Sequence, residues 1–255
     1  MEMRGPIGEM MRRMLVLLAL AMSAMSAQAV VGPSTQDGRY AAHAIMILKR
    51  SAAKAGYCSG VVIARDIVLT AAHCVADPAN LRVHFRDSAG QPVLLKVADV
   101  AIHPGFRANA KEARVRTVDL ALVRSAEPLP ASFVPAVLDE TGAVEVGAAF
   151  TIAGFGIARE NAPETSGTLR TGALTARAPL SKVLLWAKDR DASGTGACTG
   201  DSGAPIFDAA GAKVVAITAW ADGAGKAFCG KLTQGTLVAP QRGWINEVLL
   251  RWGKV

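Results

Sequence analysis

The sequence predicts an all-β fold, either a sandwich or a barrel. Short apolar runs, many of them rich in β-branched residues, alternate with segments that contain Gly, Pro, Asn or Asp. Regularly spaced short strands with such turns between them are typical of sandwiches and barrels. Neither a repeat of fixed period nor a low-complexity linker interrupts this pattern.

The expected strands follow one another along most of the chain. Each is an apolar run that is long enough to cross a sheet and is bounded by turn-forming residues. They are 44–48, 60–64, 67–71, 82–85, 93–102, 119–123, 149–156, 182–187, 213–220 and 235–239. The polar segment 160–167 contains Pro and Gly and is expected to form an exposed loop.

A helix is expected only at the C-terminal end. The apolar residues there recur at i, i+1, i+4, i+5 and i+8, which puts them on one face of a helix. They are Trp244, Ile245, Val248, Leu249 and Trp252. The complete expectation is therefore an all-β body that ends in one helix.

The first 29 residues have the organisation of an export signal. Arg12 and Arg13 precede an apolar run, and Ala27 and Ala29 form the A-x-A arrangement that signal peptidases cut. A transmembrane helix needs roughly 20 apolar residues, so a retained anchor is the less favoured alternative. Cleavage after Ala29 would leave 226 residues (255 minus 29). We expect this mature protein to be secreted or periplasmic, without stable insertion in a membrane.

The charge of the chain does not indicate a nucleic-acid-binding protein. The formal net charge is +7, but Lys and Arg are dispersed and no aromatic residues are interleaved with them. Binding to nucleic acid requires a clustered basic surface. The expected interpretation is a solvated basic surface, and nucleic acid is not an expected partner.

Four cysteines remain after the expected cleavage: Cys58, Cys74, Cys198 and Cys229. An even number of cysteines in an exported chain favours disulfides. They fall into an early and a late pair, so we expect Cys58 to bond with Cys74, and Cys198 with Cys229. A metal site is not expected, because the chain has no C-x-x-C or H-E-x-x-H motif and its four histidines are scattered. No organic cofactor is required either.

Three segments carry residues that could take part in catalysis. LTAAHC places His73 after an apolar run, TVDLALV holds Asp119, and ACTGDSGAP presents Ser202 between glycines. Taken singly, each has an ordinary explanation: a structural histidine, an aspartate on the exposed face of a strand, and a turn that needs glycine. Taken together, they supply the base, the orienting carboxylate and the nucleophile that acyl transfer requires.

The order His73, Asp119, Ser202 discriminates between folds. An α/β-hydrolase runs serine, acid, histidine, and no histidine lies C-terminal to Ser202 in this chain. A subtilisin-like order would need the acid before His73, where Asp37 and Asp66 lie in unpromising contexts. The α/β-hydrolase class is therefore excluded, and the subtilisin class is disfavoured.

With these motifs, the sequence resembles the chymotrypsin/trypsin family of serine proteases over residues 30–255. LTAAHC resembles that family's histidine box, VDLALV its aspartate strand and GDSGAP its serine box, and HPGF, AGFG and TAWADG fall at the expected places. The resemblance implies two packed six-stranded antiparallel β-barrels, divided near residues 130–145, with the active site between them and a C-terminal helix. Both cysteine pairs match disulfides typical of the family. Proteins or peptides would be the substrates, and we expect a monomer.

The resemblance implies a role for each matching residue. Ser202 would be the nucleophile, His73 the general base and then the general acid, and Asp119 the carboxylate that orients the imidazole. The backbone N–H groups of Gly200 and Ser202 would form the oxyanion hole. Removing one such donor typically costs about 3 to 4 kcal/mol of transition-state stabilisation.

The resemblance also implies an uncharged primary pocket. In the family, the residue six before the serine lines the bottom of this pocket, and here that residue is Gly196. Trp220, Ala221 and Gly235 would form the walls. The methyl group of Ala221 should narrow the entrance, so small to medium apolar side chains are expected before the cut bond. Ala219 stands where the family usually has a serine that bonds the catalytic aspartate.

The leading interpretation is a secreted serine endopeptidase that works through an acyl-enzyme on Ser202. Two alternatives stay open: a catalytically silent binding module with the same fold, and an esterase with the same triad.

In the family, a cut exposes an apolar N-terminus whose amine pairs with the aspartate before the catalytic serine, here Asp201. Because VVG begins at Val30, signal cleavage would itself be the activating cut.

Overall fold

The computed structural model describes residues 30–32, 34–35, 38–50, 55–76, 78–113 and 115–254, so the expected signal peptide lies outside the described residues. The strands are β1 (Ala44–Arg50), β2 (Ala55–Ala64), β3 (Ile67–Thr70), β4 (Leu81–Arg86), β5 (Pro92–Ile102), β6 (Ala121–Ser125), β7 (Val137–Leu138), β8 (Ala149–Gly154), β9 (Arg170–Ala176), β10 (Leu184–Asp189), β11 (Pro205–Asp208), β12 (Lys213–Gly223) and β13 (Gly230–Leu237). The helices are α2 (Ala110–Ala113) and α3 (Arg242–Arg251), and 3-10 turns cover Gly38–Tyr40, Ala72–Cys74, Pro78–Asn80, Pro163–Thr165 and Ala239–Gln241. Within these described residues, no helix has the length and apolarity needed to cross a lipid bilayer.

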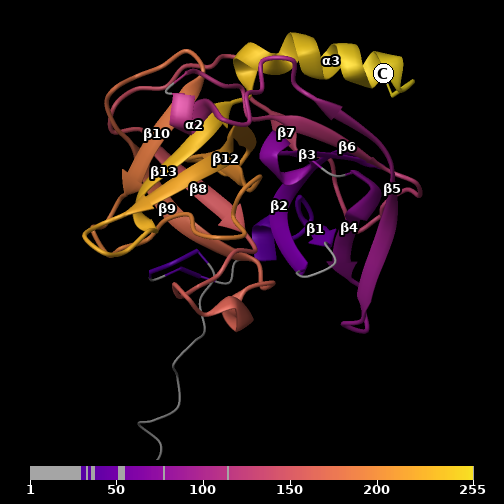
Figure 1. Cartoon of the computed structure of the whole chain (residues 1–255), viewed down its shortest axis with the longest axis horizontal. Coiled ribbons are helices and arrows are strands. Elements are labelled where there is room, and N and C mark those ends of the chain that lie inside the picture. Colours follow the sequence, from indigo (N-terminus) through magenta and orange to yellow (C-terminus); the bar gives the residue numbers. More distant parts are fainter. Residues whose placement is uncertain are drawn as a thin grey trace, which may run out of the picture.

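The first six strands form a closed antiparallel barrel in the order β1-β2-β3-β6-β5-β4. The barrel closes because β1 pairs with β2 on one side and with β4 on the other. An apolar cluster that includes Ile47, Val68 and Val83 fills the interior, and none of these three side chains is exposed. This barrel is the indigo and purple half of the molecule in Figure 1.

The second barrel follows in the sequence and is drawn in pink, orange and yellow in Figure 1. Its strands run β11-β8-β9-β10-β13-β12, the pairing of β11 with β12 closes the barrel, and the short β7 adds to β12 in parallel. Ile152, Leu174 and Ile206 belong to its fully buried interior. The two six-stranded barrels implied by the family resemblance are thus confirmed.

A third apolar cluster joins the two barrels to the C-terminal helix. Leu122 comes from the first barrel, Phe207 and Ile217 come from the second, and Ile245 and Val248 come from α3. All five side chains are at most 1% exposed. The helix lies along one edge of the molecule, where it begins near the middle and runs over the first barrel (Figure 1). The predicted C-terminal helix is confirmed, and its apolar face holds the barrels together.

Candidate active site

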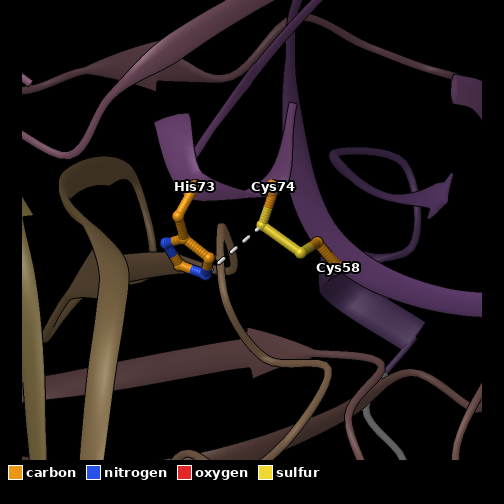
Figure 2. Close-up of side chains that lie close together, drawn as sticks. All are labelled: Cys58, His73 and Cys74. Atoms are coloured by element: carbon orange, nitrogen blue, oxygen red, sulfur yellow. Dashed lines mark hydrogen bonds between the residues drawn. A yellow bond between two sulfur atoms is a disulfide. The ribbon is translucent and has the colours of Figure 1, made fainter. Parts of the chain in front are cut away.

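His73 lies on the 3-10 turn that follows β3. All four residues of this strand are buried, so the first barrel fixes the point where the turn begins. The Cys58–Cys74 disulfide ties the turn to β2. Figure 2 shows the imidazole beside this disulfide, with Nε2 3.7 Å from Cys74 Sγ. The disulfide fixes the position of His73. Because 36% of its side chain is exposed, one part of the ring can be reached from outside.

Asp119 lies just before β6 and contacts His73 through both carboxylate oxygens. The backbone N–H of His73 donates to Oδ1 at 3.0 Å, and Nδ1 lies 2.6 Å from Oδ2. The side chain of Asp119 is only 10% exposed, which protects these bonds from competing water. A carboxylate at Nδ1 favours the tautomer that carries its hydrogen there. Nε2 is then left to accept a proton.

Ser202 lies in the turn that leads into β11. The next residue, Gly203, has φ 84°, and a Cβ on it would lie 2.1 Å from Ser59 O and 2.1 Å from Thr70 Oγ1. Only glycine therefore lets this turn pack against the first barrel. The N–H of Ser59 donates to Ser202 O at 2.8 Å, which ties the serine to β2.

Ser202 and His73 line the same cleft of about 780 Å³, which also contains Asp119. Val115, from the segment before β6, and Trp220, from β12, line it as well, so both barrels contribute. In the described part of the chain, no hydrogen bond joins Ser202 Oγ to His73 Nε2. Such bonds often tighten only when substrate binds. The structure therefore brings the three predicted residues into one cleft, with the acid and the base already paired.

The backbone just before Ser202 is held in one conformation by close contacts. Gly200 has φ 96°, and a Cβ there would lie 2.8 Å from the α-carbon of Gly156. The buried hydroxyl of Ser59 donates to Gly200 O at 2.9 Å, which fixes the orientation of the next peptide. Among the described residues, the N–H groups of Gly200 and Ser202 have no acceptor within the protein.

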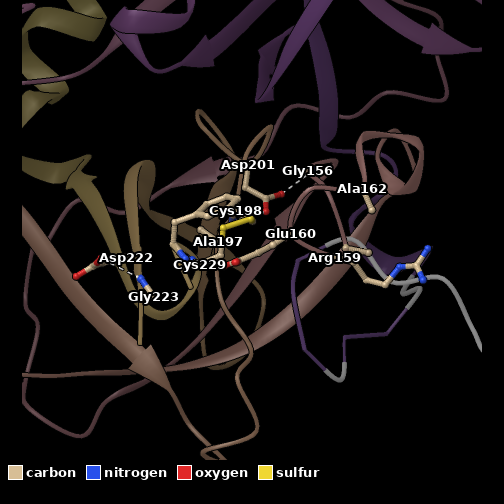
Figure 3. The surroundings of a disulfide bond; sticks show 12 residues. Gly156, Arg159, Glu160, Ala162, Ala197, Cys198, Asp201, Asp222, Gly223 and Cys229 are labelled. Carbon is tan, nitrogen blue, oxygen red and sulfur yellow. Dashed lines mark hydrogen bonds between the residues drawn. A yellow bond between two sulfur atoms is a disulfide. The ribbon is translucent and has the colours of Figure 1, made fainter. Parts of the chain in front are cut away.

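Asp201 points away from the cleft and is completely buried. The N–H of Gly156 donates to its Oδ1 at 2.8 Å and the N–H of Cys198 donates to its Oδ2 at 2.9 Å. Figure 3 shows the carboxyl group beside Gly156 and the Cys198–Cys229 disulfide. Burial raises the pKa of Asp201 to about 7, against the opposing effect of these two hydrogen bonds.

Val30, the expected partner of Asp201, is also completely buried and packs in the interior of the second barrel. The next residue, Val31, accepts a hydrogen bond from the N–H of Gly196 at 3.1 Å. This contact ties the start of the described chain to the loop that carries Ser202. Within the described residues, no hydrogen bond joins the nitrogen of Val30 to the carboxylate of Asp201.

The expected pocket residues lie in different environments. Trp220 and Ala221 line the cleft. A Cβ on Gly196 would lie 3.1 Å from the α-carbon of Gly230 and 3.3 Å from Thr233 Oγ1, so the space beside Gly196 is already filled. A Cβ on Gly235 would meet the core side chains of Ala216 and Ile206, each at 3.0 Å. The structure therefore turns Gly235 toward the interior of the barrel.

Thr233 contacts the segment before Ser202, although nothing in the sequence marks it. Its Oγ1 accepts a hydrogen bond from the N–H of Ala197 at 3.0 Å, and it pairs with Ala221 across the β12–β13 ladder. Register shifts within that ladder, one of them between Thr218 and Trp220, set this pairing. The residues KLTQG carry no local signal from which the shift could have been found.

Glu160 binds the segment around Cys229, a contact that the sequence does not indicate. Its Oε1 accepts hydrogen bonds from the N–H groups of Phe228 and Cys229, at 2.8 and 2.7 Å. Figure 3 shows its side chain reaching toward Cys229. The polar loop that the sequence predicts here therefore positions the segment on which the second disulfide ends.

One group of potential metal ligands occurs among the described residues, formed by Cys58, His73 and Cys74. Both cysteines are joined in a disulfide. Cysteine binds zinc as a thiolate and a disulfide offers none, so His73 is the one ligand that this group could supply.

Comparison with known proteins decides the family. Residues 30–245 match the sequence profile of the family named Trypsin. The chain belongs to the trypsin family. The "Trypsin-like protease" of Streptomyces glaucescens is 31% identical over 190 residues, which cover 65% of this chain and 65% of that protein. The "Chymotrypsin-like elastase family member 1" of Macaca fascicularis is 29% identical over 212 residues, covering 75% of this chain and 78% of that protein.

Solved structures of trypsin-like proteins share the same fold. Mouse brain neuropsin, described as a serine protease, matches with a TM-score of 0.68 at 20% identity, over 85% of this chain and 99% of that one. The scabies mite "inactivated protease paralogue S-I1" matches with a TM-score of 0.69 at 19% identity, over 87% of this chain and 99% of that one. The trypsin-like fold therefore occurs in an inactivated paralogue as well as in proteases, and activity has to be argued from the site.

Proposed function

We propose that this trypsin-family member is an exported serine endopeptidase that hydrolyses peptide bonds through an acyl-enzyme on Ser202. The observation that supports this best is the double contact between Asp119 and His73 in the cleft that also contains Ser202. A structural histidine needs one hydrogen bond, whereas a catalytic one needs a fixed tautomer and a second nitrogen that faces the nucleophile. His73 has a carboxylate at Nδ1 and an accessible ring edge.

The proposed reaction uses these groups in two half-reactions. Ser202 Oγ attacks the scissile carbonyl carbon while His73 Nε2 accepts the hydroxyl proton, and the N–H groups of Gly200 and Ser202 stabilise the oxyanion. The tetrahedral intermediate collapses, the C–N bond breaks, and His73 gives its proton to the leaving amine. Water then attacks the acyl-enzyme with His73 again as base, which releases the acid and restores the serine. Asp119 stabilises the imidazolium in both halves.

A digest tests the proposal directly. The purified mature protein is incubated with a peptide library and, in parallel, with matched ester substrates, and the products are identified by mass spectrometry. Cleavage of peptides by the wild type and not by Ser202→Ala supports an endopeptidase. Turnover of esters alone would support the esterase alternative. An absence of turnover of either class, from protein with both disulfides formed, would contradict the enzyme assignment and support a binding module.

The proposed specificity is for small, uncharged side chains before the cut bond. Gly196 supplies no charge, and Thr233 Oγ1 and the backbone of Gly230 crowd the space beside it. This crowding, together with the methyl group of Ala221 at the cleft, supports a shallow pocket. We therefore propose that Thr233, rather than Gly235, limits the depth of the primary substrate pocket.

Shortening Thr233 is expected to change the preferred substrate. Thr233→Gly should raise kcat/KM for Leu or Phe relative to Ala before the cut bond by about tenfold or more, because one or two methylene groups are worth this much in an apolar pocket. It also leaves the Ala197 N–H without its acceptor, so some stability is lost. Thr233→Ser keeps the hydroxyl and removes only the methyl, so it should move specificity less and preserve stability. Unchanged relative rates in both variants would contradict this role, as would a wild-type preference for Arg.

We also propose that cleavage after Ala29 activates the protein by freeing the amine of Val30 to pair with Asp201. Two observations support this: both residues are completely buried, and Val30 has φ 60°. A β-branched residue avoids this left-handed region, so cutting the bond that precedes Val30 would release the constraint. The disulfides suit an oxidising compartment outside the cytoplasm, as expected for an exported monomer that acts on peptide substrates.

N-terminal sequencing of the active protein checks this proposal. We expect the sequence Val-Val-Gly, because cleavage after Ala29 leaves Val30 as the first residue and its amine is the proposed partner of Asp201. The matched control is the mature chain with one extra alanine before Val30, which should be much less active than the chain that begins at Val30 while it keeps both disulfides. An active protein whose sequence begins elsewhere would contradict the assignment.

A further inference from the structure

The Asp201 carboxylate lies beside β8, and the neighbouring strand β9 begins with the cationic residue Arg170. The carboxylate rests against the end of β8, where a Cβ on Gly154 would lie 2.2 Å from Asp201 Oδ1 and a Cβ on Gly156 would lie 2.6 Å from Oδ2. Glycine at both positions is therefore needed to seat the carboxylate. A Cβ on Gly154 would therefore point to the same face of β8 on which the Asp201 carboxylate lies.

Arg170 occupies that same face. It is the first residue of β9 and the direct antiparallel partner of Gly154. Opposite residues of antiparallel strands project their side chains to the same side of the sheet. The side chain of Arg170 therefore extends from β9 toward the side on which the Asp201 carboxylate lies.

Arg170 is buried, which is unusual for an arginine. Only 2% of the residue is exposed, and its Nη1 donates to Thr165 O at 3.4 Å. Burying a guanidinium is costly unless an anion compensates the charge. Burial lowers the pKa of Arg170 and the charge of Asp201 raises it. Of the charged side chains that the structure describes, Arg170 is the one whose field lowers the pKa of Asp201.

We infer that Arg170 is a positioning residue for the oxyanion loop, because its charge holds the Asp201 carboxylate in place from the side of β9. The Asp201 carboxylate accepts the N–H of Cys198 and thereby holds the turn from Cys198 to Ser202, which contains the N–H groups of Gly200 and Ser202. The inference rests on the proposed function and adds an internal cation to the amine of Val30. The loop is then held in part before the amine is released, so the full chain keeps measurable reactivity at Ser202.

The test compares two forms of the protein, the full 255-residue chain and the mature chain that begins at Val30. The rate of labelling of Ser202 by a fluorophosphonate is measured for each form, because labelling requires an ordered oxyanion hole. Arg170→Met should slow labelling of the full chain by about 100-fold or more, and of the mature chain by less than about fivefold, since the Val30 amine still partners Asp201 there. Arg170→Lys, which keeps the charge, should restore most of the rate in the full chain.

The matched control is Arg177→Met, which removes an exposed arginine just after the same strand. This substitution should leave the labelling rate of both forms unchanged. If Arg170→Met slows both forms equally, the residue has only a structural role and the inference is overturned. Equal rates for Arg170→Met and the wild type in the full chain would overturn it as well.

A second measurement does not depend on activity. In the Ser202→Ala background, the Asp201 carboxyl is titrated by carbon-13 NMR, with Asp201→Asn to assign the signal. Removing a nearby cation raises the pKa of a carboxyl by about one unit or more, so Arg170→Met should raise the midpoint and Arg177→Met should not. An unchanged midpoint overturns the inference. If the wild type fails to label in both forms, the proposed function fails, and this titration still decides the role of Arg170.

Discussion

Replacing His73 by alanine is expected to lower kcat by about 10⁶-fold on any peptide that the wild type cleaves, with KM little changed. Ser202 Oγ is a weak nucleophile until a base accepts its proton, and His73 is the one histidine among the described residues that line the cleft with it. Its pairing with Asp119 orients the ring before substrate arrives. The loss should therefore appear in kcat, measured under saturating substrate.

The matched control is His84→Ala. His84 lies on β4, and its Nδ1 is 2.8 Å from Val93 O, away from the cleft. This variant should keep the activity of the wild type. The double variant His73→Ala/Ser202→Ala should be no slower than either single variant, because residues that act as a unit are not additive. More than 1% of wild-type activity in His73→Ala would contradict its role as the base.

The second large effect is expected for Asp119→Asn, with a fall in kcat of about 10⁴-fold. The amide keeps the size of the side chain, but it can present an N–H group where the imidazole N–H needs an acceptor, and His73 then takes the wrong tautomer. The two hydrogen-bonding contacts of Asp119, at 3.0 and 2.6 Å, both go to His73. Ala219 supplies no hydroxyl that could hold the amide in another orientation.

Asp87→Asn is the control for this substitution. Asp87 lies in the exposed turn between β4 and β5, where its Oδ1 accepts the N–H groups of Ala89 and Gln91. An asparagine oxygen can accept the same bonds, so kcat should not change. The two variants are compared at equal concentrations of folded protein. A loss of less than about tenfold for Asp119→Asn would indicate that His73 is oriented by something other than this carboxylate.

Much of the fold could be predicted because the strands are apolar runs bounded by turn residues. The run 93–102 corresponds to β5, and the stripe that begins at Trp244 corresponds to α3. What could not be predicted from patterning is which strands close each barrel. The pairings of β1 with β4 and of β11 with β12 are tertiary contacts, and burial alone does not specify a partner. The family resemblance supplied this part.

The site was predictable to the extent that it lies in short motifs. His73, Asp119 and Ser202 could be named because a triad has a characteristic order. Thr233 could not, because its position depends on register shifts between β12 and β13. Arg170 could not either: an arginine after a polar loop is expected to be exposed, and only the pairing of β9 with β8 turns it inward.

The most direct test of the proposed mechanism is labelling of the mature protein with a fluorophosphonate, followed by intact-protein and peptide mass spectrometry. We expect one adduct per chain, on Ser202, in the wild type and in the control Ser88→Ala, which changes an exposed turn residue. Ser202→Ala should give no adduct. An unlabelled wild type with both disulfides formed, or an adduct that persists in Ser202→Ala, would contradict a nucleophilic Ser202.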